Sequence, residues 1–124
     1  MFIAHSAPNE RIRPHSLEDH TRGVLERSLV YSRSFDPFGI TAVAALAHDL
    51  GKKTKEFQSY IQSNSGIRGS VKHALGGTIL LQEIPDIRAQ LAGIMVAGHH
   101  AGLPDAKKLI KEKIPAVALT EFGE

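Results

Sequence analysis

The stretch His48-Asp49-Leu50-Gly51-Lys52 follows an apolar run over residues 40–47, and it decides how the rest of the chain is interpreted. A charged pair at the end of an apolar helix is costly unless a partner compensates it. A divalent metal ion would do so, because imidazole and carboxylate both bind first-row metals well. The two oxygens of Asp49 also allow it to bridge two ions, which lie roughly 3.5–4 Å apart in two-metal hydrolytic sites. The doublet therefore predicts a metal site with one or two ions.

The composition predicts one ordinary globular domain over residues 1–124. The chain is 42% hydrophobic, and its 15 Lys+Arg against 13 Asp+Glu give a net charge of +2, too small to indicate nucleic acid by itself. The absence of Cys excludes disulfides and thiolate metal sites. No apolar run reaches the roughly 18 residues of a membrane span, and the first ten residues do not resemble a secretory signal. We therefore expect a cytoplasmic protein with no membrane segment.

Apolar spacing predicts helices over most of the chain and no strand. The expected helices cover residues 17–31, 36–48, the segment around 57–61, 73–83 and 85–99, with a last one over 105–113. Ser16 is expected to cap the first helix, Pro37 to lie near the first turn of the second, and Gly51 to cap its C-terminal end. The segment 85–99 is apolar at Ile87, Leu91, Ile94, Met95 and Val96. Residues 1–15 are expected to be irregular and 63–70 a loop. The predicted fold class is all-α, a bundle of helices around a central site.

Five of the seven histidines fall on expected helices or helix ends: His20, His48, His73, His99 and His100. A single histidine is usually a surface or core residue, but a helix holds its side chains rigidly enough to build a site. Five imidazoles together with Asp49 suffice for two ions. The alternative is that His20 and His73 are exposed and that the His99-His100 pair only caps a helix end. His5 and His15, in the irregular lead-in, are not expected to be ligands.

Six segments, in this order, resemble the HD superfamily of metal-dependent phosphohydrolases, and more narrowly the HD nuclease domain of the type I CRISPR-associated helicase-nuclease. They are Ala4-His5-Ser6, Leu17-Glu18-Asp19-His20, Leu46-Ala47-His48-Asp49-Leu50-Gly51-Lys52, Phe57-Gln58, Lys72-His73-Ala74 with Gly76, and Ala97-Gly98-His99-His100-Ala101-Gly102-Leu103-Pro104. A bare His-Asp doublet is weak support. The lysine after the doublet and the His-His-x-Gly-Leu ending make the resemblance specific.

The resemblance implies a role for each matched residue. His20, His48 and Asp49 would hold one metal ion, and Asp49 would bridge to a second ion held by His73, His99 and His100. Asp49 and Lys52 would be the catalytic residues, with Lys52 at the mouth of the site to stabilise phosphate charge. The implied cofactors are one or two divalent ions (Mn, Ni, Co, Fe or Mg). The implied partners are single-stranded DNA, a CRISPR helicase domain or chain, and the RNA-guided surveillance complex.

The residues themselves agree with this chemistry. Phosphodiester hydrolysis needs an activated water and neutralised phosphoryl oxygens, and two metal ions supply both. Lys52 lies about one helical turn after the doublet and would add a positive contact. A protein nucleophile is not required, which agrees with the absence of Cys and of a Gly-x-Ser-x-Gly turn. A histidine-rich site favours manganese, iron, cobalt, nickel or zinc over magnesium, which prefers oxygen ligands.

The chain departs from the family pattern at its C-terminal end. The family carries a further acidic or hydroxyl ligand on a later helix, and here Glu121 and Glu124 lie in no recognisable motif. We therefore expect an HD-type domain that lacks the C-terminal part of the family domain. Two alternatives stay open. One is an HD phosphohydrolase of nucleotides or cyclic nucleotides. The other is a catalytically incomplete metal-binding module that partners a helicase.

Overall fold

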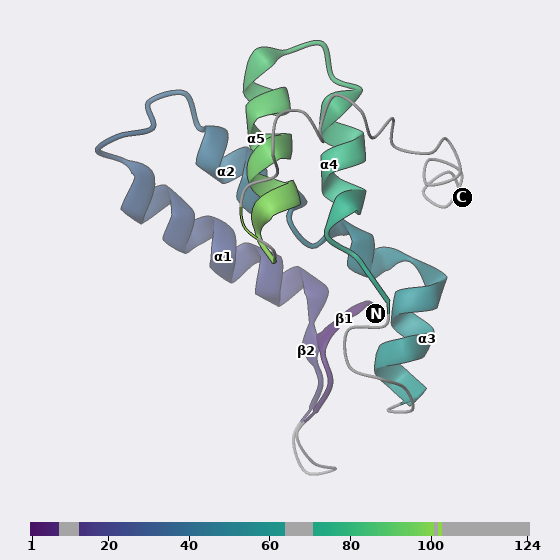
Figure 1. Ribbon diagram of the computed structural model, residues 1–124. Helices are drawn as coiled ribbons and strands as arrows, with labels where there is room; N and C mark the ends of the chain where they lie inside the picture. Colours follow the sequence, from purple (N-terminus) through teal and green to yellow (C-terminus); the bar gives the residue numbers. More distant parts are fainter. Residues whose placement is uncertain (8–12, 64–70, 101, 103–124) are drawn as a thin grey trace.

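The computed structural model describes residues 1–7, 13–63, 71–100 and 102, and its described part is mostly helical (Figure 1). In chain order the elements are β1 (Ile3–His5), β2 (His15–Ser16), α1 (Leu17–Ser32), α2 (Ile40–Ala47), the 3-10 helix η1 (Leu50–Lys53), α3 (Lys55–Ser63), α4 (Leu75–Gln82) and α5 (Ile87–Gly98). The all-α prediction is confirmed. The helix expected over 105–113, most of the loop expected over 63–70, and both Glu121 and Glu124 lie outside the described residues.

The first helix begins where its capping residue predicts. The Ser16 hydroxyl accepts a hydrogen bond from the backbone N–H of Asp19 at 3.0 Å and donates to the Asp19 carboxylate at 2.7 Å. This reciprocal pair satisfies a backbone donor that the first turn leaves without a helical partner. The cap fixes the start of α1 and places His20 in its first turn.

The second helix begins later than predicted, so the expectation that Pro37 lies near its first turn is wrong. The Asp36 carboxylate accepts hydrogen bonds from the backbone N–H groups of Ile40 (3.2 Å) and Thr41 (2.6 Å), and it caps the helix from outside. Gly39 connects the two with a left-handed φ of 73°. Only glycine adopts this conformation at low cost, so the chain turns there and the helix starts at Ile40.

Gly51 does not cap α2, contrary to the prediction. The helix ends at Ala47 with His48 as its C-terminal cap, and Gly51 lies inside η1 without a positive φ. A Cβ atom on Gly51 would lie 2.0 Å from the His73 carbonyl oxygen. Glycine is therefore required because η1 packs directly against the backbone of His73. That residue precedes α4 rather than belonging to it, which corrects the expected helix start at residue 73.

Small side chains allow the central helices α2, α4 and α5 to approach closely. The buried cluster is made of Ala44, Ala47, Leu81, Ala89, Ala92 and Val96. A Cβ atom on Gly77 would lie 1.9 Å from the Ala47 carbonyl oxygen, so α4 and α2 meet backbone to backbone. Thr78 is buried as well, and its hydroxyl donates to the Gly93 carbonyl at 3.0 Å, which joins α4 to α5.

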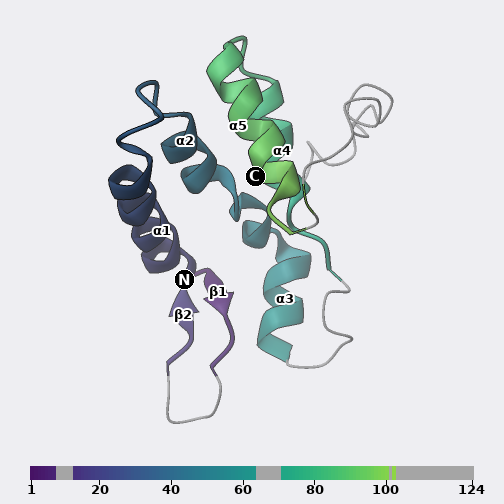
Figure 2. The ribbon, with the colours of Figure 1, turned by 60° about the vertical axis from the view of Figure 1, so that its left-hand side comes forward.

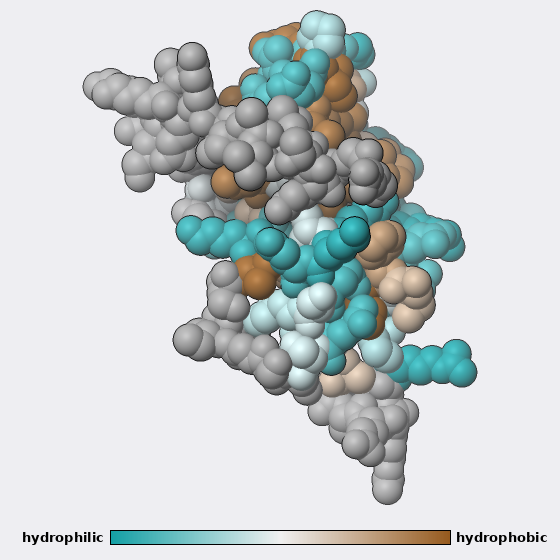
Figure 3. All heavy atoms as spheres, turned by 90° about the vertical axis from the view of Figure 1, so that its right-hand side faces the viewer, coloured by the Kyte–Doolittle hydropathy of each residue, from teal (hydrophilic) through white to brown (hydrophobic). Residues whose placement is uncertain are grey.

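The buried face of α5 is not the one that the large apolar residues indicate. Ile87, Leu91 and Met95 are 65%, 42% and 40% exposed, whereas Ala89 and Ala92 are buried with Val96. The close approach of α4 favours small residues on this face, so Ile87, Leu91 and Met95 face outward while Val96 stays buried. Figure 3 shows apolar and hydrophilic residues side by side at the upper end of the face on which α4 lies, with mostly hydrophilic residues below them.

Two short strands replace the irregular lead-in that the sequence predicts. β1 and β2 pair antiparallel, with Ile3 opposite Ser16 and His5 opposite His15. Figure 2 shows them side by side beneath the N-terminal end of α1. The Gln58 side chain fixes β1 by accepting from the Ile3 N–H and donating to the Ile3 carbonyl, both at 3.0 Å. This partner lies 55 residues away, and such short strands carry no alternating pattern that a sequence could reveal.

The described helices also bear on the membrane prediction. Among the described residues, none of the helices is both long enough and apolar enough to cross a membrane.

Candidate metal centre

The Asp49 carboxylate is the centre around which the candidate site is built. Asp49 follows the C-terminal cap of α2 and is only 4% exposed. Its two oxygens face different groups of side chains. This division decides how many ions the surrounding residues can hold.

The Oδ2 atom of Asp49 faces two imidazoles and an ammonium group. It lies 3.1 Å from His20 Nε2, 3.2 Å from His48 Nε2 and 2.9 Å from Lys52 Nζ. The two imidazole nitrogens lie 3.3 Å from each other. His20, His48 and Asp49 can thus offer three ligand atoms that all lie within 4.8 Å of one another.

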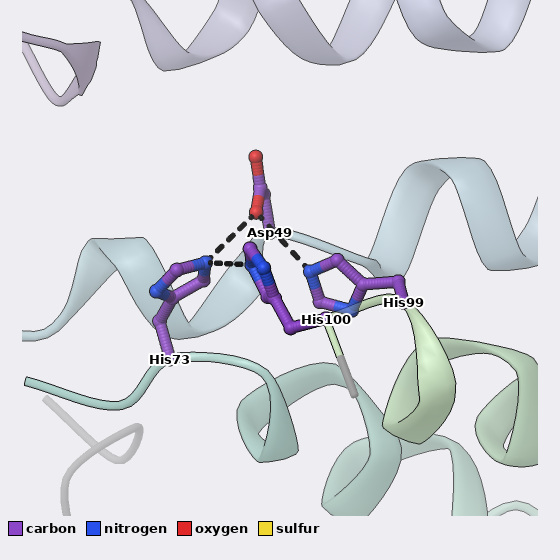
Figure 4. Close-up of side chains that lie close together, drawn as sticks. All are labelled: Asp49, His73, His99 and His100. Atoms are coloured by element: carbon purple, nitrogen blue, oxygen red, sulfur yellow. Dashed lines mark hydrogen bonds and ion pairs between the residues drawn. The ribbon is translucent and has the colours of Figure 1, made fainter. Parts of the chain in front are cut away.

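The Oδ1 atom faces a second group of imidazoles. It lies 3.4 Å from His73 Nε2 and 3.7 Å from His99 Nε2, and His73 Nε2 lies 2.8 Å from His100 Nε2. Figure 4 shows both ion pairs ending at one carboxylate oxygen, while the other oxygen points away from these three rings. Asp49, His73, His99 and His100 form a second set with ligand atoms within 4.8 Å of one another. The two sets share Asp49.

Backbone carbonyls orient two of the imidazoles in the same way. His48 Nδ1 lies 2.7 Å from the Ala45 carbonyl, and His99 Nδ1 lies 2.6 Å from the Val96 carbonyl. A carbonyl only accepts, so each Nδ1 carries a proton and each Nε2 faces the centre, where a deprotonated Nε2 would offer its lone pair to a metal. Metal-binding histidines commonly show this arrangement, because the second hydrogen bond fixes both tautomer and ring orientation.

The position of each histidine follows from a helix end. His48 and His99 are the C-terminal caps of α2 and α5, and each ring donates to the carbonyl three residues earlier. His20 lies in the first turn of α1, and His73 is held by the close packing of Gly51. Three helices and the segment before α4 therefore converge on one carboxylate.

The protonation states also suit a metal. Burial alone would raise the pKa of Asp49, but hydrogen bonds from His48, His73 and Lys52 outweigh it and hold the pKa far below its ordinary range. Burial lowers the pKa of both His20 and His100, which favours the neutral form that binds a metal. His48 differs, because its hydrogen bond to Asp49 raises its pKa, so a metal would have to displace this proton to bind His48.

The residues fit divalent transition-metal ions. Five imidazole nitrogens and one ionised carboxylate provide nitrogen and oxygen ligands of the kind that such ions prefer. The carboxylate stays ionised while buried because Lys52, His48 and His73 donate hydrogen bonds to it, and a divalent cation among the imidazoles would add to this compensation. The side chains of His20, His48, His73 and His99 are 14–21% exposed, so the centre is only partly covered by the described residues.

The expectation that Lys52 lies at the mouth of the site is wrong. Its side chain is 7% exposed, and its ammonium group lies between the Asp49 carboxylate and the Ala4 carbonyl, which accepts at 3.3 Å. The η1 helix turns the chain back so that residue 52 comes under residue 49 instead of pointing outward. The structure thus brings all the expected ligand residues together and places Lys52 behind them.

Two histidines that the sequence left outside the site lie beside it. The rings of His5 and His15 lie 5.0 Å and 5.7 Å from that of His20, measured between centroids. Sequence spacing gives no signal for this contact, since it depends on the pairing of β1 with β2.

A comparison with known proteins shows a similarity to part of a CRISPR-associated protein. A stretch of 79 residues is 37% identical to the CRISPR-associated nuclease/helicase Cas3 of Haloferax volcanii. The match covers 58% of this chain and 8% of that relative, so the chain spans a small part of the relative's length. The similarity indicates a Cas3-related region. No protein-family model matches the chain, and no solved structure matches it.

Proposed function

We propose that this chain is an HD-type metal-dependent phosphodiester hydrolase, over residues 1–124, that cleaves single-stranded DNA in CRISPR antiviral defence. The observation that carries the proposal is the division of the Asp49 carboxylate, with one oxygen toward each set of imidazoles. A carboxylate arranged in this way suits a pair of ions. The similarity to a Cas3 nuclease/helicase supports the CRISPR context.

In this proposal the six expected ligand residues divide between two metal ions. His20 and His48 hold one ion with Asp49 Oδ2, and His73, His99 and His100 hold the other with Oδ1. Divalent ions at such a centre supply a Lewis acid for the phosphoryl oxygens and a means of activating water. The histidine-rich ligand set favours manganese, iron, cobalt or nickel over magnesium.

Lys52 acts as a positioning residue in this scheme and does not bind the phosphate. Its ammonium group already has two acceptors, the Asp49 carboxylate and the Ala4 carbonyl. It compensates the buried carboxylate and keeps Oδ2 in place. A role in binding phosphate would require Lys52 to leave both partners.

A polymer suits the centre better than an enclosed small molecule. One hollow near the centre, of about 1040 Å³, is lined by Asp49. Another, of about 260 Å³, is lined by His48 and His99. His73 and His100 line neither of these two hollows. In the part of the chain that the structure describes, His20, His48, His73 and His99 keep 14–21% of their side chains exposed, which supports access by a polymer. A helicase domain or chain and the RNA-guided surveillance complex are the proposed partners that would deliver the strand.

Cleavage of circular single-stranded DNA by the chelator-stripped protein tests the proposal, with Mn²⁺, Ni²⁺ and Mg²⁺ added back separately. We expect cleavage with Mn²⁺ or Ni²⁺ and its loss in Asp49→Ala, because that side chain belongs to both ligand sets. Glu26→Gln, which removes an exposed carboxylate on α1, is the matched control and should cleave normally.

Three results would contradict the proposal in different ways. Full activity of a folded Asp49→Ala protein would exclude the mechanism. Turnover of mononucleotides or cyclic nucleotides without cleavage of DNA would identify a nucleotide phosphohydrolase. Metal uptake with neither activity would identify an incomplete module that depends on a partner chain.

A further inference from the structure

A third cluster of histidines lies beside the Asp49 centre. His5, His15 and His20 each offer one ring nitrogen, and these nitrogens all lie within 4.8 Å of one another. The ring centroids are 6.0 Å apart for His5 and His15, 5.0 Å for His5 and His20, and 5.7 Å for His15 and His20. Each histidine comes from a different element, namely β1, β2 and α1.

Backbone and buried side-chain contacts hold the cluster together. The pairing of β1 with β2 places His5 opposite His15. The N–H of Leu17 donates to the Phe2 carbonyl at 2.9 Å, which fixes the start of α1 against β1. Lys52 and Gln58 bind the backbone of β1 immediately before His5. The three rings are thus brought together by contacts that do not involve the rings themselves.

We propose that His5, His15 and His20 form a separate binding site for one transition-metal ion. Three neutral imidazoles are a suitable ligand set for zinc, nickel, cobalt or copper, with water completing the shell. Imidazole ligands lie about 2.0–2.1 Å from zinc, and two of them at a tetrahedral angle lie about 3.3 Å apart. His5 and His15 are exposed, so rotation of their side chains can close the remaining distance. Magnesium is disfavoured because the cluster offers no oxygen ligand.

His20 links this histidine cluster to the Asp49 centre. Its Nε2 atom lies 3.1 Å from Asp49 Oδ2, so the same ring belongs to both ligand sets. Because the two positions share His20, an ion bound at one position weakens the binding of an ion at the other. Binding at the histidine cluster should be weaker than at the centre, which has a carboxylate, and it should be strengthened when Asp49 is removed. This inference does not depend on nuclease activity.

Equilibrium dialysis of the full chain against Ni²⁺ and against Mg²⁺ tests the inference. The variant His5→Gln/His15→Gln keeps polar side chains on both strands, and we expect it to bind one Ni²⁺ ion fewer than the unaltered chain. Mg²⁺ binding should not change. In the Asp49→Ala background, the same two substitutions should weaken the remaining Ni²⁺ binding by at least tenfold.

The outcomes separate clearly. Equal numbers of Ni²⁺ ions and equal affinities in both proteins would overturn the proposal and leave the rings as a surface stack. Loss of all Ni²⁺ and Mg²⁺ ions together would also overturn it, because it would show that β1 only supports the centre. Loss of one Ni²⁺ ion in a protein that cleaves no DNA would uphold this site while the proposed function failed.

Discussion

Lys52 and Asp49 form a buried ion pair at the base of the candidate centre. Lys52 Nζ lies 2.9 Å from Asp49 Oδ2, and the two side chains are 7% and 4% exposed. The same ammonium group donates to the Ala4 carbonyl, so the pair also connects the centre to β1. One side chain therefore compensates the central carboxylate and fixes the strand that carries His5.

Lys52→Ala should destabilise the metal-free protein by on the order of 3 kcal/mol, as expected when one partner of a buried ion pair is removed. A bound divalent ion restores positive charge beside Asp49, so the destabilisation should be smaller at saturating Mn²⁺. Urea unfolding with chelator and with Mn²⁺ measures both values. The matched control is Lys53→Ala, whose side chain is exposed and whose effect should stay within about 0.5 kcal/mol.

Equal stability of Lys52→Ala and the unaltered chain in chelator would contradict the role given to this residue. Lys52 would then be free to leave its partners and bind a phosphate, as the sequence alone suggested. Measurement of kcat and KM on single-stranded DNA would separate the two roles. If Lys52 binds the phosphate, the substitution should impair cleavage while leaving the free energy of unfolding unchanged.

Gly51→Ala should lower the affinity for the metal ion that His73, His99 and His100 would hold. The added Cβ would lie 2.0 Å from the His73 carbonyl oxygen, so the backbone carrying His73 must shift. Overpacking of this kind costs about 1–3 kcal/mol of folding free energy. Titration with Mn²⁺ should show weaker binding of one ion, and urea unfolding should show a lower free energy of unfolding.

Gly23→Ala is the control for the substitution itself. Gly23 lies inside α1, and a Cβ atom there would meet nothing within 4 Å. Alanine at such a position stabilises by about 0.4–1 kcal/mol, since it restricts the unfolded chain. If Gly51→Ala behaved like Gly23→Ala in both measurements, the close approach of η1 to His73 would be wrong.

The sequence predicted most of the helices for physical reasons that are local, whereas the gathering of the six expected ligands was predicted from the family resemblance. Ser16 caps α1 through its immediate neighbours, and His48 and His99 lie where apolar runs end. Helix ends are set by residues a few positions away, and the ligands occur at those ends. Their convergence on Asp49 then follows from how the helices pack.

The interactions that the sequence did not predict join residues far apart in the chain. Gly51 was interpreted as a cap, but its conformation is set by His73, which lies in a different element. The strand β1 depends on Gln58, and the Lys52 ammonium group is held by the carbonyl of Ala4, which lies 48 residues away. No periodicity within a short segment reports such partners, so tertiary packing decided each case.

Gly77→Ala should be among the more damaging single substitutions in the described core. Its Cβ would lie 1.9 Å from the Ala47 carbonyl oxygen, where α4 meets α2, and 3.2 Å from a methyl group of Val96. Backbone on one side and a buried side chain on the other leave no easy relaxation, so we expect stability to fall by at least about 1–3 kcal/mol. Thermal unfolding measures this loss of stability. A midpoint equal to that of the unaltered chain would show that α2 and α4 can move apart without cost.

The N-terminal cap of α5 gives a stability signal at acid pH. The Asp86 carboxylate accepts from the backbone N–H of Arg88 at 2.8 Å and pairs with the Arg88 guanidinium, which lowers the pKa of Asp86 to about 2. Because the folded pKa is depressed, this carboxylate stabilises the fold above its ordinary value near 4. The contribution is lost as the pH falls from there toward about 2.

Asp86→Asn separates the cap from the charge. Asparagine caps a helix as well as aspartate does, but it carries no charge to pair with Arg88. The measured quantity is the difference in thermal midpoint between the unaltered chain and Asp86→Asn. This difference should be constant above about pH 5 and should shrink toward zero between about pH 4 and 2, because protonation of Asp86 is linked to stability. Asp86→Ala, which removes the cap as well, should remain less stable than Asp86→Asn at every pH. A difference between the unaltered chain and Asp86→Asn that did not change with pH would show that the carboxylate acts only as a cap.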